Sequence, residues 1–433
     1  MKTLATDDQT IEDLNIFSKR NGNGIYDIYN HTNTKGGEEL LKELFLHPLS
    51  NHDDINQRIG IIEHFAKLGM EFPFRGAQLD MAEKYMENAE LSRKNSQQQQ
   101  VLGEKEIQQG VTSFIELLQS IKTFADNISL SGIDAYQQEL SAIVALLQDA
   151  AFEPVFREEN KGRLSYAAIT AYDVLFRLRE HVKIKKLLGH IYHLDVYLSI
   201  AKLARDRSFV FPKALKKAGA ILNVTGVYHP ELSKPVGNDI TITANKNIVF
   251  LTGANMAGKS TFLRAISTAL YVAHVGFPVA VKHMEFSVMD GIYTTINLPD
   301  NLGIGASHFY SEVLRVKKVA TELNMGKSLF IVFDELFRGT NVKDAHEGTV
   351  AIIRAFAKNT DSLFIISSHI VEAGEDLKQQ SSIDFQYLPT RMNGHVPEYT
   401  YTLESGITDD RHGMIIIRNE GILEILKNGQ KSI

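Results

Sequence analysis

The amino-acid sequence predicts an α/β fold with a phosphate-binding loop, preceded by an all-α region. The first observation is the string Leu251-Thr-Gly-Ala-Asn-Met-Ala-Gly-Lys-Ser-Thr261, which contains G-x-x-x-x-G-K-S. The second is that apolar runs of strand length alternate with helical patterns after residue 216. The third is that long helical patterns fill much of the chain before that point. We therefore expect two domains, residues 1–216 and residues 217–433.

The composition is that of an ordinary globular protein and excludes several kinds of site. A net charge of −6 argues against a globally basic nucleic-acid-binding protein, so any DNA contact would come from a local patch. The absence of cysteine excludes disulfides, thiolate zinc sites and cysteine nucleophiles. The N-terminus lacks an apolar signal core, and no apolar run reaches the roughly 18 residues that span a bilayer. We expect a cytoplasmic protein with no membrane partner.

The all-α region is expected to begin with a loose polar lead-in over residues 1–35. Helical patterns follow at Gly37–Phe45, after Asp53 and at Arg75–Leu91. Three longer patterns then place apolar residues at alternating spacings of four and three, which is typical of a heptad seam. Their apolar positions are Ile107, Val111, Phe114, Leu118, Ile121 and Ala125; Tyr136, Leu140, Ile143 and Leu147; and Leu164, Ala168, Ala171, Leu175, Leu178 and Val182. An antiparallel arm is the simplest structure, with the third helix running to Leu203 and kinked at Gly189. An ordinary helical core without a lever role is the alternative.

The α/β region is expected to gather its polar strand ends in one cleft. The strand patterns are Ile240–Thr243, Asn247–Thr252, Asp290–Ile296, Ser328–Glu335 and Leu363–His369, and the helical patterns are Thr261–Val275, Ser307–Leu323, Asp344–Ala357 and Gly421–Asn428. Ligands in such sheets bind beyond the carboxyl ends of the strands. The glycine loop, the pair Asp334-Glu335 and the pair Ser368-His369 should therefore converge.

The residue types in this cleft predict nucleotide chemistry. Backbone N–H groups of a glycine loop and of the following helix bind phosphates, and Lys259 would add a charge beside them. Ser260 and Asp334 offer the oxygen ligands that Mg²⁺ prefers. Glu335 would orient or deprotonate a water, and His369 would donate a hydrogen bond to that water or to the γ-phosphate. The alternatives are a chance glycine turn and a structural histidine that closes a strand.

Several strings resemble the MutS family. Thr252–Thr261 resembles its T-G-P-N-M-x-G-K-S-T, and Asp334–Asn341 resembles its D-E-x-x-R-G-T-S/T. Weaker matches are Ser307–Glu312 to S-T-F-x-x-E, with His308 in place of threonine, Ser367–His369 to A-T-H, Tyr228–Pro230 to R-H-P, His412-Gly413 to S-Y-G-I, and Leu44–Pro48 and Leu194–Ala201 to parts of the helical core. The resemblance implies an α/β P-loop ATPase domain of the ABC type, preceded by an all-α helical core and lever domain.

The resemblance also implies a homodimer that uses ATP and Mg²⁺ in composite sites. The implied ATP-binding residues are Gly253, Ala254, Asn255, Met256, Ala257, Gly258, Lys259, Ser260, Thr261, His229, Pro230 and Val236. Asn255, Glu335 and His369 would be catalytic, and Ser260 and Asp334 would bind the metal. Ser307 would reach the γ-phosphate of the other subunit, and the Arg338 loop would carry signals across the dimer. A helix N-cap and a surface charge are the respective alternatives.

The sequence also departs from the family pattern. It begins where the family's helical core begins, so we expect no mismatch-recognition domain. Phe114-Ile-Glu116 and Phe156-Arg-Glu158 match that domain's Phe-x-Glu string but lie in helical patterns. We recognise no β-rich clamp between residues 100 and 200 and no nuclease-type C-terminal domain. Val236 stands where the family has an aromatic residue that stacks on adenine.

Two functions compete. The leading prediction is a MutS-like, ATP-hydrolysing dimer on duplex or branched DNA, acting with other repair proteins and reading no mismatches itself. Its DNA contacts are unknown; a basic cluster that either contacts phosphates or is a solvated helix face comprises Arg177, Arg179, Lys183, Lys185 and Lys186. The second prediction is a nucleotide-switched scaffold that binds proteins and no DNA, which the negative charge favours. An ABC transporter subunit or chromosome-organising ATPase is disfavoured, because L-S-G-G-Q is absent between the two nucleotide motifs.

Overall fold

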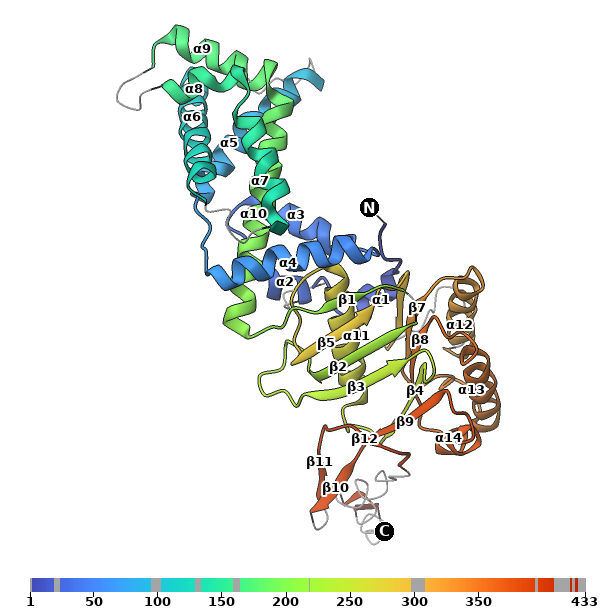
Figure 1. The fold of residues 1–433 in the computed structure, drawn as a ribbon. Coiled ribbons are helices and arrows are strands. Elements are labelled where there is room, and N and C mark those ends of the chain that lie inside the picture. Colours follow the sequence, from blue (N-terminus) through green and yellow to red (C-terminus); the bar gives the residue numbers. More distant parts are fainter. Residues whose placement is uncertain are drawn as a thin grey trace. The chain divides into compact units, whose positions relative to one another are not determined.

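The fold consists of two compact units (Figure 1). The computed structural model describes residues 2–18, 24–94, 103–128, 134–158, 164–217, 219–296, 308–393, 396–408, 421–422 and 425–426. The first unit takes residues 1–28, 47–56 and 208–433, and the second takes residues 29–46 and 57–207. The division at residue 216 stays a prediction. Within the described ranges, no helix is both long enough and apolar enough to cross a membrane.

The first unit contains two sheets. In the described residues the larger sheet has the strand order β12 (Glu404–Ser405), β9 (Ile383–Leu388), β4 (Ile248–Gly253), β8 (Leu363–Ser367), β7 (Leu329–Phe333) and β6 (Gly291–Thr295). The pairs from β9 to β6 are parallel, and β12 is antiparallel. The smaller sheet has the order β1 (Lys213–Leu215), β5 (His283–Ser287), β2 (Ile221–Val227) and β3 (Asn238–Thr243), and β10 (Thr390–Asn393) pairs with β11 (Val396–Tyr399).

Helices cover both faces of the larger sheet (Figure 1). α11 (Lys259–Val275) packs against β2, β4 and β6, so it lies between the two sheets and is apolar on nearly all sides. The other face carries α12 (His308–Asn324), α13 (Val342–Phe356) and α14 (Val371–Leu377). Strands buried on both faces read as continuous apolar runs, which explains why β4, β7 and β8 were predictable.

The N-terminal segment is part of the first unit, and the prediction of a loose lead-in was wrong. Ala5 forms a parallel bridge with Gly291 at the β6 edge, with its N–H donating to the Asp290 carbonyl at 2.8 Å. Two short helices follow, α1 (Asp8–Asp13) and α2 (Ile25–Tyr29). The segment combines buried apolar side chains such as Leu14 and Ile16 with hydrogen bonds from polar residues, and its apolar positions follow no regular helical or strand spacing.

The second unit is helical in its described residues. Its elements, with α4 starting in the first unit, are α3 (Lys35–Leu46), α4 (His52–Leu68), α5 (Gly76–Lys94), α6 (Glu104–Asn127), α7 (Asp134–Leu147), a 3₁₀ turn (Ala150–Phe152), α8 (Glu153–Arg157), α9 (Tyr166–Val174), a π-helix (Leu175–Arg179) and α10 (His181–Arg207). α6 packs against α5, α7, α8 and α9. The predicted seams of α6 and α7 are confirmed, because Phe114, Leu118 and Ile143 are buried.

The third predicted seam was wrong: Leu175 is buried, but Ala171 before the π-helix is exposed, and so are Leu178 and Val182 after it. The π-helix inserts an extra residue into the turn, which rotates every later side chain by about 100°. Leu178 and Val182 are consequently 55% and 66% exposed, while Phe176 and Ile184 are buried. α10 continues through Gly189, and the break in the helix lies before His181 instead.

Candidate nucleotide site

The glycine loop connects β4 to α11 with a backbone that requires its glycines. Gly253 has φ 145° and Gly258 has φ 101°, which side chains other than glycine rarely adopt. A Cβ at Gly258 would lie 3.0 Å from the Tyr401 ring, and one at Gly253 would lie 3.1 Å from the Leu388 carbonyl. The motif therefore folds into a tight turn that leads directly into the N-terminus of a helix, where backbone N–H groups attract anions.

Lys259 holds its ammonium against the loop. Its Nζ donates to the carbonyl oxygens of Gly253 at 2.8 Å and Ala254 at 3.1 Å, and the residue is 6% exposed. Burial lowers the pKa of Lys259, whereas the carboxylates of Asp334 and Glu335 raise it. Two acids and one buried cation thus share this end of the sheet.

Asp334 links the loop helix to the neighbouring strands. Its carboxylate accepts a hydrogen bond from Ser260 Oγ at 2.5 Å and another from Ser367 Oγ. Ser367 also accepts from the Glu335 N–H at 3.0 Å. Ser368, which was expected only to end a strand at this cleft, accepts a hydrogen bond from Ile370 N–H. The overlooked signal was that Ser367 ends β8, next to β7, which leads into Asp334.

Glu335 lies between a histidine and an arginine. Nε2 of His369 is 2.7 Å from its Oε1, and Arg338 Nη1 donates to Oε2 at 3.3 Å. The hydrogen bond with His369 lowers the pKa of Glu335 to about 2, although burial acts in the opposite direction. The carboxylate is therefore ionised at neutral pH and is held by contacts on both oxygens.

A pocket of about 260 Å³ lies beside the start of α11. It is lined by Val227, Tyr228, His229, Leu232, Lys234, Val236, Asn238, Gly258, Thr261, Phe262, Ala265, Leu388 and Tyr401. Tyr401 was missed by the sequence reasoning, although it supplies an aromatic ring to the wall that holds Val236. Asn238 fixes this segment, since its Nδ2 donates to the Tyr401 carbonyl and its Oδ1 accepts from Leu403 N–H.

The remaining predicted residues are less closely gathered. Asn255 and Met256 are exposed at the tip of the loop, and Met256 has φ 70°. His229 lines the pocket and burial lowers its pKa, while Pro230 is buried and is not among the lining residues. Ser307 and the segment with His412 lie outside the described residues.

Comparison with known proteins assigns the family. Residues 9–201 match the model of MutS domain III, and residues 249–432 match that of MutS domain V. The chain belongs to the MutS family. This MutS-family chain is 29% identical over 273 residues to the DNA mismatch repair protein MutS of Fusobacterium nucleatum, covering 60% of this chain and 30% of that protein. It is 25% identical over 423 residues to the DNA mismatch repair protein MSH7 of Arabidopsis thaliana, covering 84% and 37%. It spans about a third of the length of these relatives.

The basic cluster predicted on the arm of this MutS-family chain is partly occupied by internal ion pairs. Arg177 makes two hydrogen bonds to Asp173, at 2.6 and 2.5 Å. Lys183 pairs with Asp149 at 2.6 Å and Glu180 at 2.7 Å. These contacts neutralise both cations locally, which weakens them as candidates for phosphate contacts.

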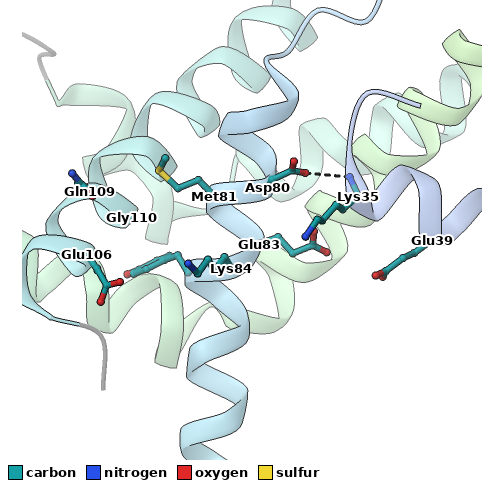
Figure 2. A pocket seen from close by; sticks show the side chains of 10 residues that line it. Lys35, Glu39, Asp80, Met81, Glu83, Lys84, Glu106, Gln109 and Gly110 are labelled. Atoms are coloured by element: carbon teal, nitrogen blue, oxygen red, sulfur yellow. Dashed lines mark hydrogen bonds between the residues drawn. The ribbon is translucent and has the colours of Figure 1, made fainter. Parts of the chain in front are cut away.

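The helical unit also contains a pocket of about 520 Å³, whose lining carries more acidic than basic side chains (Figure 2). Side chains from α3, α5 and α6 line it, including Glu39, Asp80, Glu83 and Glu106 against Lys35 and Lys84. The backbone N–H of Lys35 donates to Asp80 at 3.1 Å. Four acids against two lysines make this wall repulsive to a phosphate backbone.

Proposed function

We propose that this MutS-family chain forms a dimer that binds and hydrolyses ATP and associates with duplex or branched DNA. The observation that carries the proposal is the cluster at the carboxyl end of the parallel sheet. There Lys259, Ser260, Asp334, Glu335 and His369 lie within one chain of hydrogen bonds and charge interactions. Two acids and a buried lysine beside a glycine loop are the groups that phosphoryl transfer to water requires.

The residues of the cluster would have three roles: binding the phosphates, binding Mg²⁺ and orienting the attacking water. The loop residues 253–261 would bind the phosphates through backbone N–H groups and the Lys259 ammonium. Ser260 and Asp334 already place a hydroxyl and a carboxylate 2.5 Å apart, a donor set that suits Mg²⁺. When bound, the ion would neutralise charge on the phosphate oxygens. Glu335 would orient the attacking water, with His369 and Asn255 assisting.

The pocket beside α11 would hold the nucleobase. It is small, its wall is partly apolar, and it adjoins the loop through Gly258 and Thr261. Tyr401 offers a ring for stacking on a base, which compensates for an aliphatic residue at Val236. His229 also lines the pocket, and burial lowers its pKa.

We propose that these residues read no mismatches by themselves. Insertion of an aromatic side chain between bases needs a ring that is free to leave the protein. Phe114 is fully buried in α6, and the Phe156 ring packs against Lys122, whose Nζ lies 5.6 Å from the ring centre. Phe114 therefore offers no such ring, and the contact with Lys122 disfavours insertion of Phe156. A cytoplasmic location stays a prediction.

The test is a pair of measurements on the wild-type chain. We expect Mg²⁺-dependent phosphate release from ATP, and weak binding to duplex, mismatched and branched DNA that changes with nucleotide. Absence of ATP turnover with every DNA form present would contradict the proposal. Nucleotide binding without any DNA binding at low salt would support the scaffold, which the ion pairs of Arg177 and Lys183 and the acidic pocket favour.

A further inference from the structure

α12 carries a buried arginine that joins three elements. Arg315 is 7% exposed, and its guanidinium contacts α1 and the end of β6. It donates to the Thr294 carbonyl at 2.6 Å and to Thr295 Oγ1 at 3.1 Å, and it forms an ion pair with Asp7. Because a buried charge is costly unless it is paired and hydrogen-bonded, this set of partners fixes the position of α12.

α1 is itself anchored to the end of β6. Asp13 is 3% exposed and accepts hydrogen bonds from Thr294 Oγ1 and Ile296 N–H, both at 2.8 Å. Thr10 Oγ1 accepts from Thr294 N–H at 3.0 Å. Asp7 also caps α1 by accepting from Thr10 N–H. The N-terminal helix, the edge strand and α12 therefore form one polar cluster.

One turn earlier, α12 contacts the loop that follows β7 and contains Asp334, Glu335 and Arg338, which we call the acidic loop. Glu312 is 6% exposed, and its carboxylate accepts from the backbone N–H groups of Arg338 and Gly339, each at 3.3 Å. In this loop Glu335 has φ 56° and Phe337 has φ 62°. Left-handed backbone at residues other than glycine costs free energy and persists only where surrounding contacts fix it. The position of α12 thus bears on the conformation of Glu335.

We propose that Arg315 and Asp7 are positioning residues for hydrolysis: they hold α12 so that Glu312 keeps the loop with Glu335 in its left-handed conformation. The inference rests on the proposed ATPase function, since it names the support of the same site. Contacts join α1 to Arg315, helix α12 carries both Arg315 and Glu312, and Glu312 contacts the loop that follows Glu335. Neither positioning residue touches the glycine loop, so nucleotide affinity should not depend on them.

The test combines kinetics with hydrogen exchange on Arg315→Met. We expect kcat to fall by about 10- to 100-fold, as for misplacement of a catalytic group, with KM and Kd for ATP changed less than about twofold. Backbone amides of residues 335–339 should exchange faster, while those of β4 and β8 stay protected. Lys213→Met is the matched control, because it removes a lysine that pairs with Glu285 in the same unit and should leave both readouts unchanged.

The outcomes separate this inference from the proposed function. A wild-type chain without ATP turnover overturns both, because there is then no hydrolysis to position. An active wild type with an equally active Arg315→Met variant overturns the positioning role alone. Parallel loss of affinity, activity and thermal stability shows a merely structural role and also overturns it. If Arg315→Met does not fold, Asp7→Asn decides, since it keeps the cap acceptor and removes the charge: reduced kcat with unchanged Kd supports the inference, and unchanged kcat contradicts it.

Discussion

At the residue scale, Lys259 has no acidic partner within salt-bridge distance among the described contacts; its Nζ bonds to two loop carbonyls. Lys259→Ala removes the cation that the loop holds, so we expect loss of ATP hydrolysis and weaker nucleotide binding. A fluorescent-nucleotide titration and a phosphate-release assay measure both. Lys246→Ala is the matched control, because Lys246 is exposed and pairs with Asp384 in the same unit. Turnover at the wild-type rate in Lys259→Ala would refute the site assignment.

Glu335→Gln keeps the shape of the side chain and removes its basicity. We expect the variant to bind ATP while hydrolysis slows by several powers of ten at most, which is a few kcal/mol of barrier. ATP-bound dimers should then accumulate, and light scattering with ATP reports their mass. A variant that stays monomeric at micromolar concentration would count against the composite site.

The pH dependence of the rate should report the contact between His369 and Glu335. This contact is the largest cause of the lowered pKa of Glu335, about 2 against an ordinary value of 4.5. His369→Ala removes it, so the pKa of Glu335 rises and the base is protonated at a higher pH. We expect the acid limb of the kcat profile to move to higher pH in the variant. An unchanged acid limb would show that another group controls it.

The same shift has a consequence for stability. Because the folded pKa of Glu335 lies below the unfolded value, the ionised carboxylate stabilises the fold above pH 4.5, and this contribution is lost as the pH falls towards 2.

The motif residues were predictable because their spacing is fixed by a tight turn. Ser367 and Tyr401 were not, because each reaches the site through strand pairing or a distant hairpin that no local pattern reveals.

At the element scale, the strands and helices that are stabilised by apolar burial were predictable from the sequence, whereas those held by polar contacts were not. β4, β7 and β8 are buried on both faces, so each appears in the sequence as a continuous apolar run. α1 is held by Asp13 and by the partners of Arg315, and polar contacts of this kind leave no periodic signal. The π-helix could not be predicted for another reason. The heptad spacing of apolar residues continues through residues 175–182, although the turn there holds one residue more than an α-helical turn.

That difference gives a stability test. Leu118 is 1% exposed in the confirmed seam of α6, so Leu118→Ala should cost about 2–5 kcal/mol of unfolding free energy. Leu178 is 55% exposed, so Leu178→Ala should cost less than about 1 kcal/mol. Denaturant titration of both variants measures the two costs. Equal costs would place Leu178 in the core and would show that the predicted heptad seam continues through that residue.

At the scale of the whole molecule, the proposed DNA association would rest on contacts to phosphates. Phosphate contacts hold a protein on DNA without reading sequence, and their affinity falls steeply with salt. Because Arg177 and Lys183 form internal ion pairs, Arg179 and Lys186 are the stronger candidates for phosphate contacts. Two contacts would give a slope of about −2 in log affinity against log salt, at about 0.9 per phosphate.

We therefore expect weak, salt-dependent DNA binding with a mismatch preference below about tenfold, or 1.4 kcal/mol. The measurement is a competition between matched and G·T-mismatched duplexes at two salt concentrations. Lys186→Ala should reduce the salt slope by about one, whereas Lys183→Ala should leave it unchanged because Asp149 and Glu180 already neutralise that lysine. A larger mismatch preference would place specificity in residues other than these. Undetectable binding to every DNA form at low salt would instead support a nucleotide-switched scaffold that binds proteins. The site around Lys259 requires no DNA to bind ATP.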